Sequence, residues 1–278
     1  MKLGEHPMST LVTGATGQVG RRVLTELRRR GLPAAGASRG GEVRLDWTDT
    51  SSWKPALEGV ESLFVSVPMA SGLSERAEAF LQQASESGVG TAVLVTAMGA
   101  EDGPPDSEQR RLEAKVRELF GRWTIVRPNW LDQDFTEGVF ARLARSRNGR
   151  LELPVSKRCA VSFVDARDVA HTIVAALTDD AHHQREYTLT GPAPVTFREV
   201  VRGTKGTESP VWRYKKVDEA GFYFRATNTG WSDRYVDTLN ERFRAIADGR
   251  AAKVTEDVRR ALGRDPVPMA KFVREAVH

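Results

Sequence analysis

A glycine-rich turn between a predicted strand and a predicted helix constrains this chain more than any other feature. The run Gly14-Ala15-Thr16-Gly17-Gln18-Val19-Gly20 directly follows the β-branched segment 10–13 and opens the segment 19–30, whose apolar residues have helical spacing. Small residues here permit a tight turn and bring the backbone close to a bound group. Because the first N–H groups of a helix lack partners within it, this turn favours an anion such as a pyrophosphate.

The first half of the chain alternates short aliphatic segments with segments suited to helices. The predicted strands are 10–13, 34–37, 42–45, 62–67, 92–96 and 123–127, and the predicted helices are 19–30, 74–87 and 107–120. Continuously apolar strands separated by helices predict a parallel sheet that is covered on both faces. The fold class is therefore α/β, a Rossmann-like doubly wound parallel sheet, and the turn at 14–20 predicts dinucleotide binding.

Beyond Pro128 the alternation loosens. We expect a helix at 131–145, strands at 150–153 and 161–164, a helix at 166–177, a strand at 186–189, a short helix from the capping-box spacing at 196–199 to residue 202, an isolated strand at 211–215, and mainly helices from 218. Residues 1–150 are predicted to be the NAD(P)-binding domain, with 1–7 as a loose extension. Residues 151–278 are predicted to form a smaller, mainly helical substrate-binding annex with elements that return to the sheet, and the boundary is soft.

Composition excludes several classes of protein. The 278 residues include 41 Lys and Arg against 37 Asp and Glu, which gives a formal charge of +4, and the basic residues are interspersed with acids. This pattern is typical of a solvated surface, and it argues against a nucleic-acid partner. One Cys and five His without ligand spacing predict neither a disulfide nor a metal site. We expect a cytoplasmic monomer or homodimer that binds a small-molecule substrate and no membrane.

The residues after the second predicted strand bear on cofactor choice. An NAD site usually has an Asp or Glu at this position, where it accepts hydrogen bonds from the ribose, whereas this chain has Ser38 and Arg39. A guanidinium suits a 2′-phosphate, so NADP is favoured over NAD. The alternative is that Arg39 is an ordinary exposed loop residue. Asp46, after the next short strand, is a further candidate for the same site.

Several motifs together resemble one family. They are T-G-A-T-G-Q-V-G at 13–20, S-R at 38–39, L-D-W-T-D at 45–49, I-V-R-P-N-W at 125–130 and F-V-D-A-R-D-V-A at 163–170. In order and spacing they are similar to the NmrA-like atypical short-chain dehydrogenases/reductases, over nearly the whole chain. The segment from Val254 to Arg274 resembles the branch that contains the ergot-alkaloid reductases of the festuclavine dehydrogenase type.

The resemblance implies a set of site residues. Those implied to contact the cofactor are Gly14, Thr16, Gly17, Gln18, Val19, Ser38, Arg39, Ser66, Val67, Pro68, Thr96 and Ala97. Gly20 of the glycine turn and Asp46 are further cofactor candidates from their own places in the sequence. Those implied to line the substrate pocket are Met98, Asn129 and Trp130, with Tyr223 added from an aromatic run in the annex. Phe222 to Phe224 have core packing as their alternative role.

The usual catalytic pair of the superfamily is missing from its expected place. A Tyr followed four residues later by a Lys usually begins the helix after the strand that ends near Thr96, but here the four Tyr are Tyr187, Tyr214, Tyr223 and Tyr235. The remaining candidates for a catalytic group are Thr96, Asp132 and Asp134. The two Asp residues have helix N-caps as their alternative role.

Three functions stay open on this basis. The first is an NADPH-dependent reductase of a hydrophobic unsaturated, iminium or carbonyl compound in secondary metabolism. Such acceptors need little acid catalysis when the pocket positions them well. The second is a cofactor-bound enzyme of redox-neutral chemistry such as a cyclisation. The third is a non-catalytic sensor of the NADP/NADPH ratio that binds a protein partner.

Overall fold

The chain forms two compact units, each discontinuous in sequence. The computed structural model describes residues 10–68, 72–205, 209–211 and 213–275, so the predicted extension at 1–7 lies outside the described residues. The first unit contains the chain up to Pro128 and the segment Val169–Thr188. The second unit contains Asn129–Asp168 and the chain from Leu189 onward. The units divide at Pro128, and the domain boundary near residue 150 stays a prediction.

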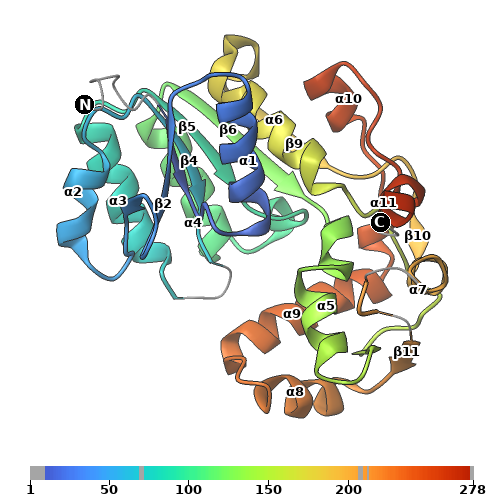
Figure 1. Cartoon of the computed structure of the whole chain (residues 1–278). Helices are drawn as coiled ribbons and strands as arrows, with labels where there is room; N and C mark the ends of the chain where they lie inside the picture. Colours follow the sequence, from blue (N-terminus) through green and yellow to red (C-terminus); the bar gives the residue numbers. More distant parts are fainter. Residues whose placement is uncertain (1–9, 69–71, 206–208, 212, 276–278) are drawn as a thin grey trace, which may run out of the picture. The chain divides into compact units, whose positions relative to one another are not determined.

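A seven-stranded sheet dominates the first unit within the described part of the chain (Figure 1). The strand order is β3-β2-β1-β4-β5-β6-β9. The bounds are Thr10–Thr13 for β1, Ala34–Ser38 for β2, Val43–Arg44 for β3, Ser62–Ser66 for β4, Thr91–Val95 for β5, Arg122–Pro128 for β6 and Arg185–Leu189 for β9. All neighbouring strands from β3 to β6 pair in parallel, which confirms the predicted doubly wound sheet.

Helices cover both faces of this sheet. They are α1 (Gln18–Arg29), α2 (Trp53–Ala56), α3 (Ser74–Glu86), α4 (Glu108–Leu119) and α6 (Ala166–Thr178), with 3₁₀ turns η1 (Thr50–Ser52), η2 (Ala100–Asp102) and η4 (Asp180–His182). On one face α2, α3 and α4 share a buried cluster with Leu11, Leu63 and Leu94. The neighbouring residues Val12 and Phe64 are equally buried but lie outside that cluster. Successive strand residues point to opposite faces, so both faces of the sheet are apolar.

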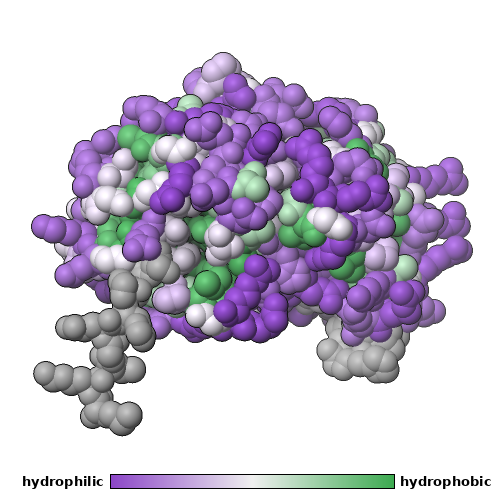
Figure 2. Space-filling view, turned by 90° about the horizontal axis from the view of Figure 1, so that it is seen from above, coloured by the Kyte–Doolittle hydropathy of each residue, from purple (hydrophilic) through white to green (hydrophobic). Residues whose placement is uncertain are grey.

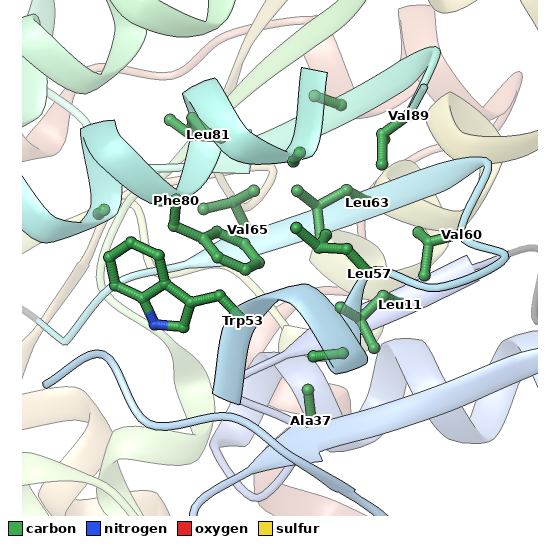
Figure 3. Packing of buried hydrophobic residues seen from close by; sticks show 14 of the residues in the cluster. Leu11, Ala37, Trp53, Leu57, Val60, Leu63, Val65, Phe80, Leu81 and Val89 are labelled. Carbon is green, nitrogen blue, oxygen red and sulfur yellow. The ribbon is translucent and has the colours of Figure 1, made fainter. Parts of the chain in front are cut away.

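Aromatic side chains occupy one end of the cluster on the α2–α4 face. Phe80 of α3 meets Trp47 and Trp53 edge-on, with ring centroids 5.2 and 5.8 Å away. Figure 3 shows Phe80 and Trp53 beside Leu57, Val65 and other aliphatic residues of the cluster. Burying each such side chain contributes about 1.5–3 kcal/mol, so this layer anchors the helices to the sheet.

The second unit is mainly helical. Its elements are η3 (Asp132–Phe135), α5 (Val139–Arg145), β7 (Arg150–Leu153), β8 (Ala160–Val161), β10 (Val195–Thr196), α7 (Phe197–Gly203), β11 (Arg213–Lys216), α8 (Glu219–Thr227), α9 (Asp233–Ala247), η5 (Arg250–Ala252), α10 (Asp257–Leu262) and α11 (Met269–Glu275). β7 pairs in parallel with β11, and β8 pairs antiparallel with β10.

Two predicted elements of this unit are wrong in form. The continuous helix at 131–145 is divided into η3 and α5, because the Gln133 carbonyl accepts the N–H groups of Thr136, Glu137 and Gly138 and turns the chain. The strand predicted at 211–215 is not isolated, since β11 pairs with β7. Residue 212 of that prediction lies outside the described residues.

The described helices include none that is long and apolar enough to cross a membrane. The face of the molecule in Figure 2 is mostly hydrophilic, with hydrophobic residues among the hydrophilic ones.

Candidate functional site

The glycine turn requires glycine for steric reasons. Gly14 has φ +61°, and a Cβ on it would lie 3.3 Å from the Cβ of Ser66. A Cβ on Gly20 would overlap the Gly14 carbonyl oxygen. The Gly17 N–H donates to that same oxygen at 2.9 Å, which closes the turn. Backbone therefore packs directly on backbone between β1 and α1, and the surface of the turn is left open to a ligand.

The start of α1 has hydrogen-bond donors to offer. Gly17 is its N-cap and provides no side-chain cap bond. The side-chain amide nitrogen of Gln18, Nε2, is buried and lacks a hydrogen-bond partner among the described residues. An unpaired buried donor costs free energy unless a ligand satisfies it. Backbone N–H groups and an amide donor at a helix N-terminus fit the oxygen atoms of a pyrophosphate.

Arg39 lies exposed just beyond β2. The turn that follows it is held by Ser38, whose carbonyl accepts the N–H groups of Gly41 at 3.3 Å and Leu45 at 3.0 Å. Asp46 is fixed nearby, since its Oδ1 accepts the Thr48 N–H at 2.8 Å and the Thr48 hydroxyl at 2.7 Å. These two bonds hold the pKa of Asp46 below its usual value, and the charge of Arg39 lowers it further. The end of β2 thus carries a solvent-facing cation beside a braced carboxylate.

The other predicted cofactor residues of the first unit follow β4 and β5. The Ser66 N–H donates to Thr13 Oγ1 at 2.9 Å, which ties the ends of β1 and β4 together. Thr96 and Met98 donate their N–H groups to Val126 and Pro128, each at 3.0 Å. Ala97 is buried, whereas Val67 is half-buried and Pro68 exposed. The carboxyl ends of parallel strands meet at one edge, so the fold brings these residues to the edge where α/β proteins bind ligands.

A buried ionic network below Thr96 was not predicted. The Thr96 hydroxyl donates to Glu113 Oε1 at 2.9 Å, and Arg127 binds both carboxylate oxygens of Glu113, at 2.8 and 2.6 Å. Arg127 also donates to Glu186 at 2.7 Å, and Arg117 bridges Glu113 and Glu186. Burial alone lowers the pKa of Arg127, but its bonds to these two carboxylates raise it overall. A signal existed in the sequence, since Glu113 lies beside Leu112 on a buried stripe and Arg127 interrupts an apolar strand.

The predicted substrate residues of the second unit are occupied by contacts within that unit. The Asn129 amide donates to Ser162 Oγ at 2.9 Å and to the Ala251 carbonyl at 2.9 Å. Trp130 is 4% exposed and stacks on Phe140 and Phe243, with centroids 5.1 and 5.5 Å away. The Arg242 guanidinium also lies 4.2 Å from the centroid of the Trp130 ring. Their roles in substrate binding stay predictions.

The aromatic run in α8 divides between core and solvent. Phe222 is buried against Phe243, whereas Phe224 is 68% exposed. Tyr223, half-exposed between them, forms a hydrogen bond with Asp233 that raises the pKa of its phenol. Core packing therefore accounts for Phe222, and the substrate contact of Tyr223 stays a prediction.

The two candidate acids of η3 differ sharply. Asp134 accepts the N–H groups of Leu131 at 3.2 Å and Val139 at 3.4 Å, so it caps the backbone on both sides. Asp132 is fully buried, and both of its oxygens lack a hydrogen-bond partner among the described residues. Burial raises the pKa of Asp132 well above its usual value, and the charges of Asp165 and Asp168 raise it further.

This fold and this glycine turn define a Rossmann-type dinucleotide-binding protein. Residues 14–180 match the model of the NAD(P)H-binding family, and the chain belongs to that family. The resemblance to NmrA-like atypical reductases is also confirmed, and the ergot-branch resemblance is supported by an agroclavine dehydrogenase of Claviceps fusiformis, 24% identical over 96% of this chain and 97% of the relative.

Other relatives have reductase names. A (4-alkanoyl-5-oxo-2,5-dihydrofuran-3-yl)methyl phosphate reductase of Streptomyces griseus is 30% identical, covering 95% of this chain and 96% of the relative. An NAD(P)H azoreductase of Xenophilus azovorans is 28% identical, covering 95% and 96%.

Solved structures have the same fold. A Citrobacter triphenylmethane reductase complexed with NADP(H) has a TM-score of 0.76 at 22% identity, over 96% of this chain and 99% of that one. An Escherichia coli NADPH-dependent quinone oxidoreductase complexed with NADPH has a TM-score of 0.77 at 19% identity, over 96% and 99%. NmrA, a negative transcriptional regulator in complex with NAD, has a TM-score of 0.72 at 13% identity, over 98% and 96%.

We expect Gly20→Ala to weaken NADPH binding at least about tenfold, because the new methyl group displaces the Gly14 carbonyl and opens the turn. Fluorescence titration with NADPH measures this, with thermal unfolding as a check that the variant folds. Gly121→Ala is the matched control, since a Cβ there meets nothing within 4 Å. Equal NADPH affinity in both variants would contradict the assigned role of the turn.

We expect Asp132→Asn to stabilise the protein at neutral pH. The folded chain holds the Asp132 proton to a higher pH than the unfolded chain, whose carboxyl has its ordinary pKa near 3.8. The stability that this proton brings is full below that value and is lost as the pH rises toward the folded pKa. At pH ~7 the variant should therefore have a higher free energy of unfolding than the wild type.

The gain in stability should vanish as the pH falls toward the pKa of the carboxyl in the unfolded chain. Urea unfolding at a series of pH values measures this. Asp237→Asn, at an exposed position of α9, is the control. Parallel pH profiles for wild type and Asp132→Asn would exclude a buried titrating carboxyl.

Proposed function

We propose that this protein is an NADPH-dependent reductase of hydrophobic, electron-poor small molecules, with a role in secondary metabolism. The observation that carries the proposal is the glycine turn. There backbone packs on backbone, and the buried side-chain nitrogen Nε2 of Gln18 has no hydrogen-bond partner among the described residues. Such a turn fits a pyrophosphate closely, because no side chain intervenes between the backbone donors and the anion.

Each cofactor residue has a distinct task in this proposal. The N–H groups at the start of α1 and the Gln18 amide hold the pyrophosphate, and Arg39 pairs with the 2′-phosphate. Ser66 to Pro68 lie along the nicotinamide ribose, and Thr96 and Ala97 approach the nicotinamide. The bound cofactor supplies a hydride, and the protein orients the acceptor against it and excludes water.

The type of acceptor follows from the groups that the chain offers. The helix that usually begins with Tyr and Lys is here α4, which begins at Glu108, and its buried acid Glu113 is fully paired. An electron-poor acceptor accepts hydride with little acid catalysis, and solvent then supplies the proton. The names of the similar proteins above mention azo compounds, quinones and an alkanoyl-substituted oxodihydrofuran. All of these are electron-poor π systems.

We expect Arg39→Ala to lower NADPH affinity about tenfold or more and to leave NADH affinity unchanged, since a charge-assisted bond to the 2′-phosphate is lost. Arg29→Ala is the control. Arg29 lies at the C-terminal end of α1, away from the glycine turn, and its loss changes the net charge by the same amount. Isothermal titration with each cofactor measures both affinities. If the unmutated protein binds NADPH and NADH equally, Arg39 does not select the cofactor.

We expect deuterium from one of the two stereospecifically labelled forms of NADPH to appear in the product. The acceptors to test are a quinone, an azo dye, a triphenylmethane dye and an alkanoyl oxodihydrofuran, with mass spectrometry of the product. Turnover without label would favour redox-neutral chemistry such as a cyclisation. NADPH binding without turnover, together with NADP-dependent retention of a protein partner, would favour the redox sensor.

A further inference from the structure

The Thr96 hydroxyl donates its hydrogen bond to the Glu113 carboxylate. Glu113 is fully buried, and it accepts two N–H groups of Arg127 at 2.8 and 2.6 Å and one of Arg117 at 3.2 Å. The guanidinium N–H groups donate to both oxygens of this carboxylate, so the carboxylate acts here only as an acceptor. In the 2.9 Å contact with Thr96 the hydroxyl must therefore be the donor.

This polarity decides what else Thr96 can bind. A hydroxyl has one proton and two lone pairs, so once its proton is used it can act toward a further group only as an acceptor. Thr96 is half-exposed and directly follows β5, at the edge of the sheet where α/β proteins bind ligands. A ligand N–H or O–H can bind there, whereas a ligand carbonyl would face lone pairs.

The network fixes this arrangement firmly. Arg127 is 3% exposed and is hydrogen-bonded to Glu113 and to Glu186, and Glu101 Oε2 lies 3.5 Å from its Nε. Arg117 is hydrogen-bonded to the same two carboxylates. Buried ion pairs often add little stability relative to apolar side chains of the same size. Their value here is that the carboxylate facing Thr96 is held in one orientation.

From this geometry, and resting on the proposed function, we infer that Glu113 is a positioning residue that makes Thr96 a hydrogen-bond acceptor for the carboxamide amino group of the nicotinamide. The carboxamide offers an N–H donor and a carbonyl acceptor, and Thr96 selects the amino end. Thr96 therefore orients the cofactor and does not deliver a proton to the substrate.

The test compares the binding of two cofactors that differ at one group. In the 3-acetylpyridine analogue of NADP+ a methyl group replaces the amino group, and the carbonyl is kept. Wild-type protein should bind NADP+ about fivefold more tightly than the analogue, the contribution of one hydrogen bond. In Thr96→Val the affinity for NADP+ should fall to that for the analogue, whereas Thr96→Ser should keep the preference. Isothermal titration gives each Kd.

The role of Glu113 needs a variant that still folds. Glu113→Met together with Arg127→Met removes both buried charges, and Arg117 stays paired with Glu186 at 2.6 Å. Thr96 is retained, but its hydroxyl is free to rotate and to donate, so the preference for NADP+ should fall toward one. Glu186→Gln is the control, because it removes a partner of Arg127 and leaves the Thr96–Glu113 bond. It should keep the preference.

The outcomes separate this inference from the function on which it rests. If the wild-type protein does not bind NADP+, both are wrong. If it binds NADP+ and Thr96→Val keeps the wild-type preference, this inference alone is wrong. It is also wrong if Thr96→Val lowers kcat and changes the solvent isotope effect while the two affinities keep their ratio, because Thr96 would then be the proton donor.

Discussion

The parallel sheet of the first unit has two faces to bury, and the rest of that unit follows from this need. Leu11 and Leu63 point to one face, and Val12 and Phe64 point to the other. Each face needs its own layer of helices, so helices connect most of the successive parallel strands. The tightest of these connections is the one from β1 to α1, where glycine lets the helix begin directly on the strand.

Buried polar groups are as a rule hydrogen-bonded, and two near the ligand edge of this unit follow that rule. Glu113 is fully buried against Arg127, and Thr13 is used by the Ser66 N–H. In the second unit Asp132 departs from this rule, since both of its oxygens lack a partner among the described residues. A neutral carboxyl is the form that tolerates such a site, because burying an unpaired charge costs far more.

Local sequence predicted the elements of the first unit well, because their signals are local. The turn at 14–20, the aliphatic strands and the helical stripes depend on neighbouring residues. The division of the predicted helix at 131–145 depends on the Gln133 carbonyl, and the pairing of β7 with β11 joins segments far apart in sequence. Such contacts are visible only when the chain is folded.

The candidate site follows the same division. The glycines are predicted to be cofactor residues from the spacing of the turn, and Arg39 from its place after the second strand, and both roles stay predictions. Glu113 and Asp132 were harder to interpret, because a buried acid in one sequence has no local signature of its partner. Their environments depend on side chains from other elements, such as Arg127 beside Glu113 and Asp165 near Asp132.

The discontinuity of the two units has a consequence for folding. β9 completes the sheet of the first unit beside β6, yet most of the chain between β6 and α6 belongs to the second unit. Closing that long loop costs entropy before the pairing of β6 with β9 returns any stability. During synthesis β1 to β6 emerge first and expose the edge of β6 until β9 arrives. An unpaired strand edge of this kind is open to wrong pairing in a nascent chain.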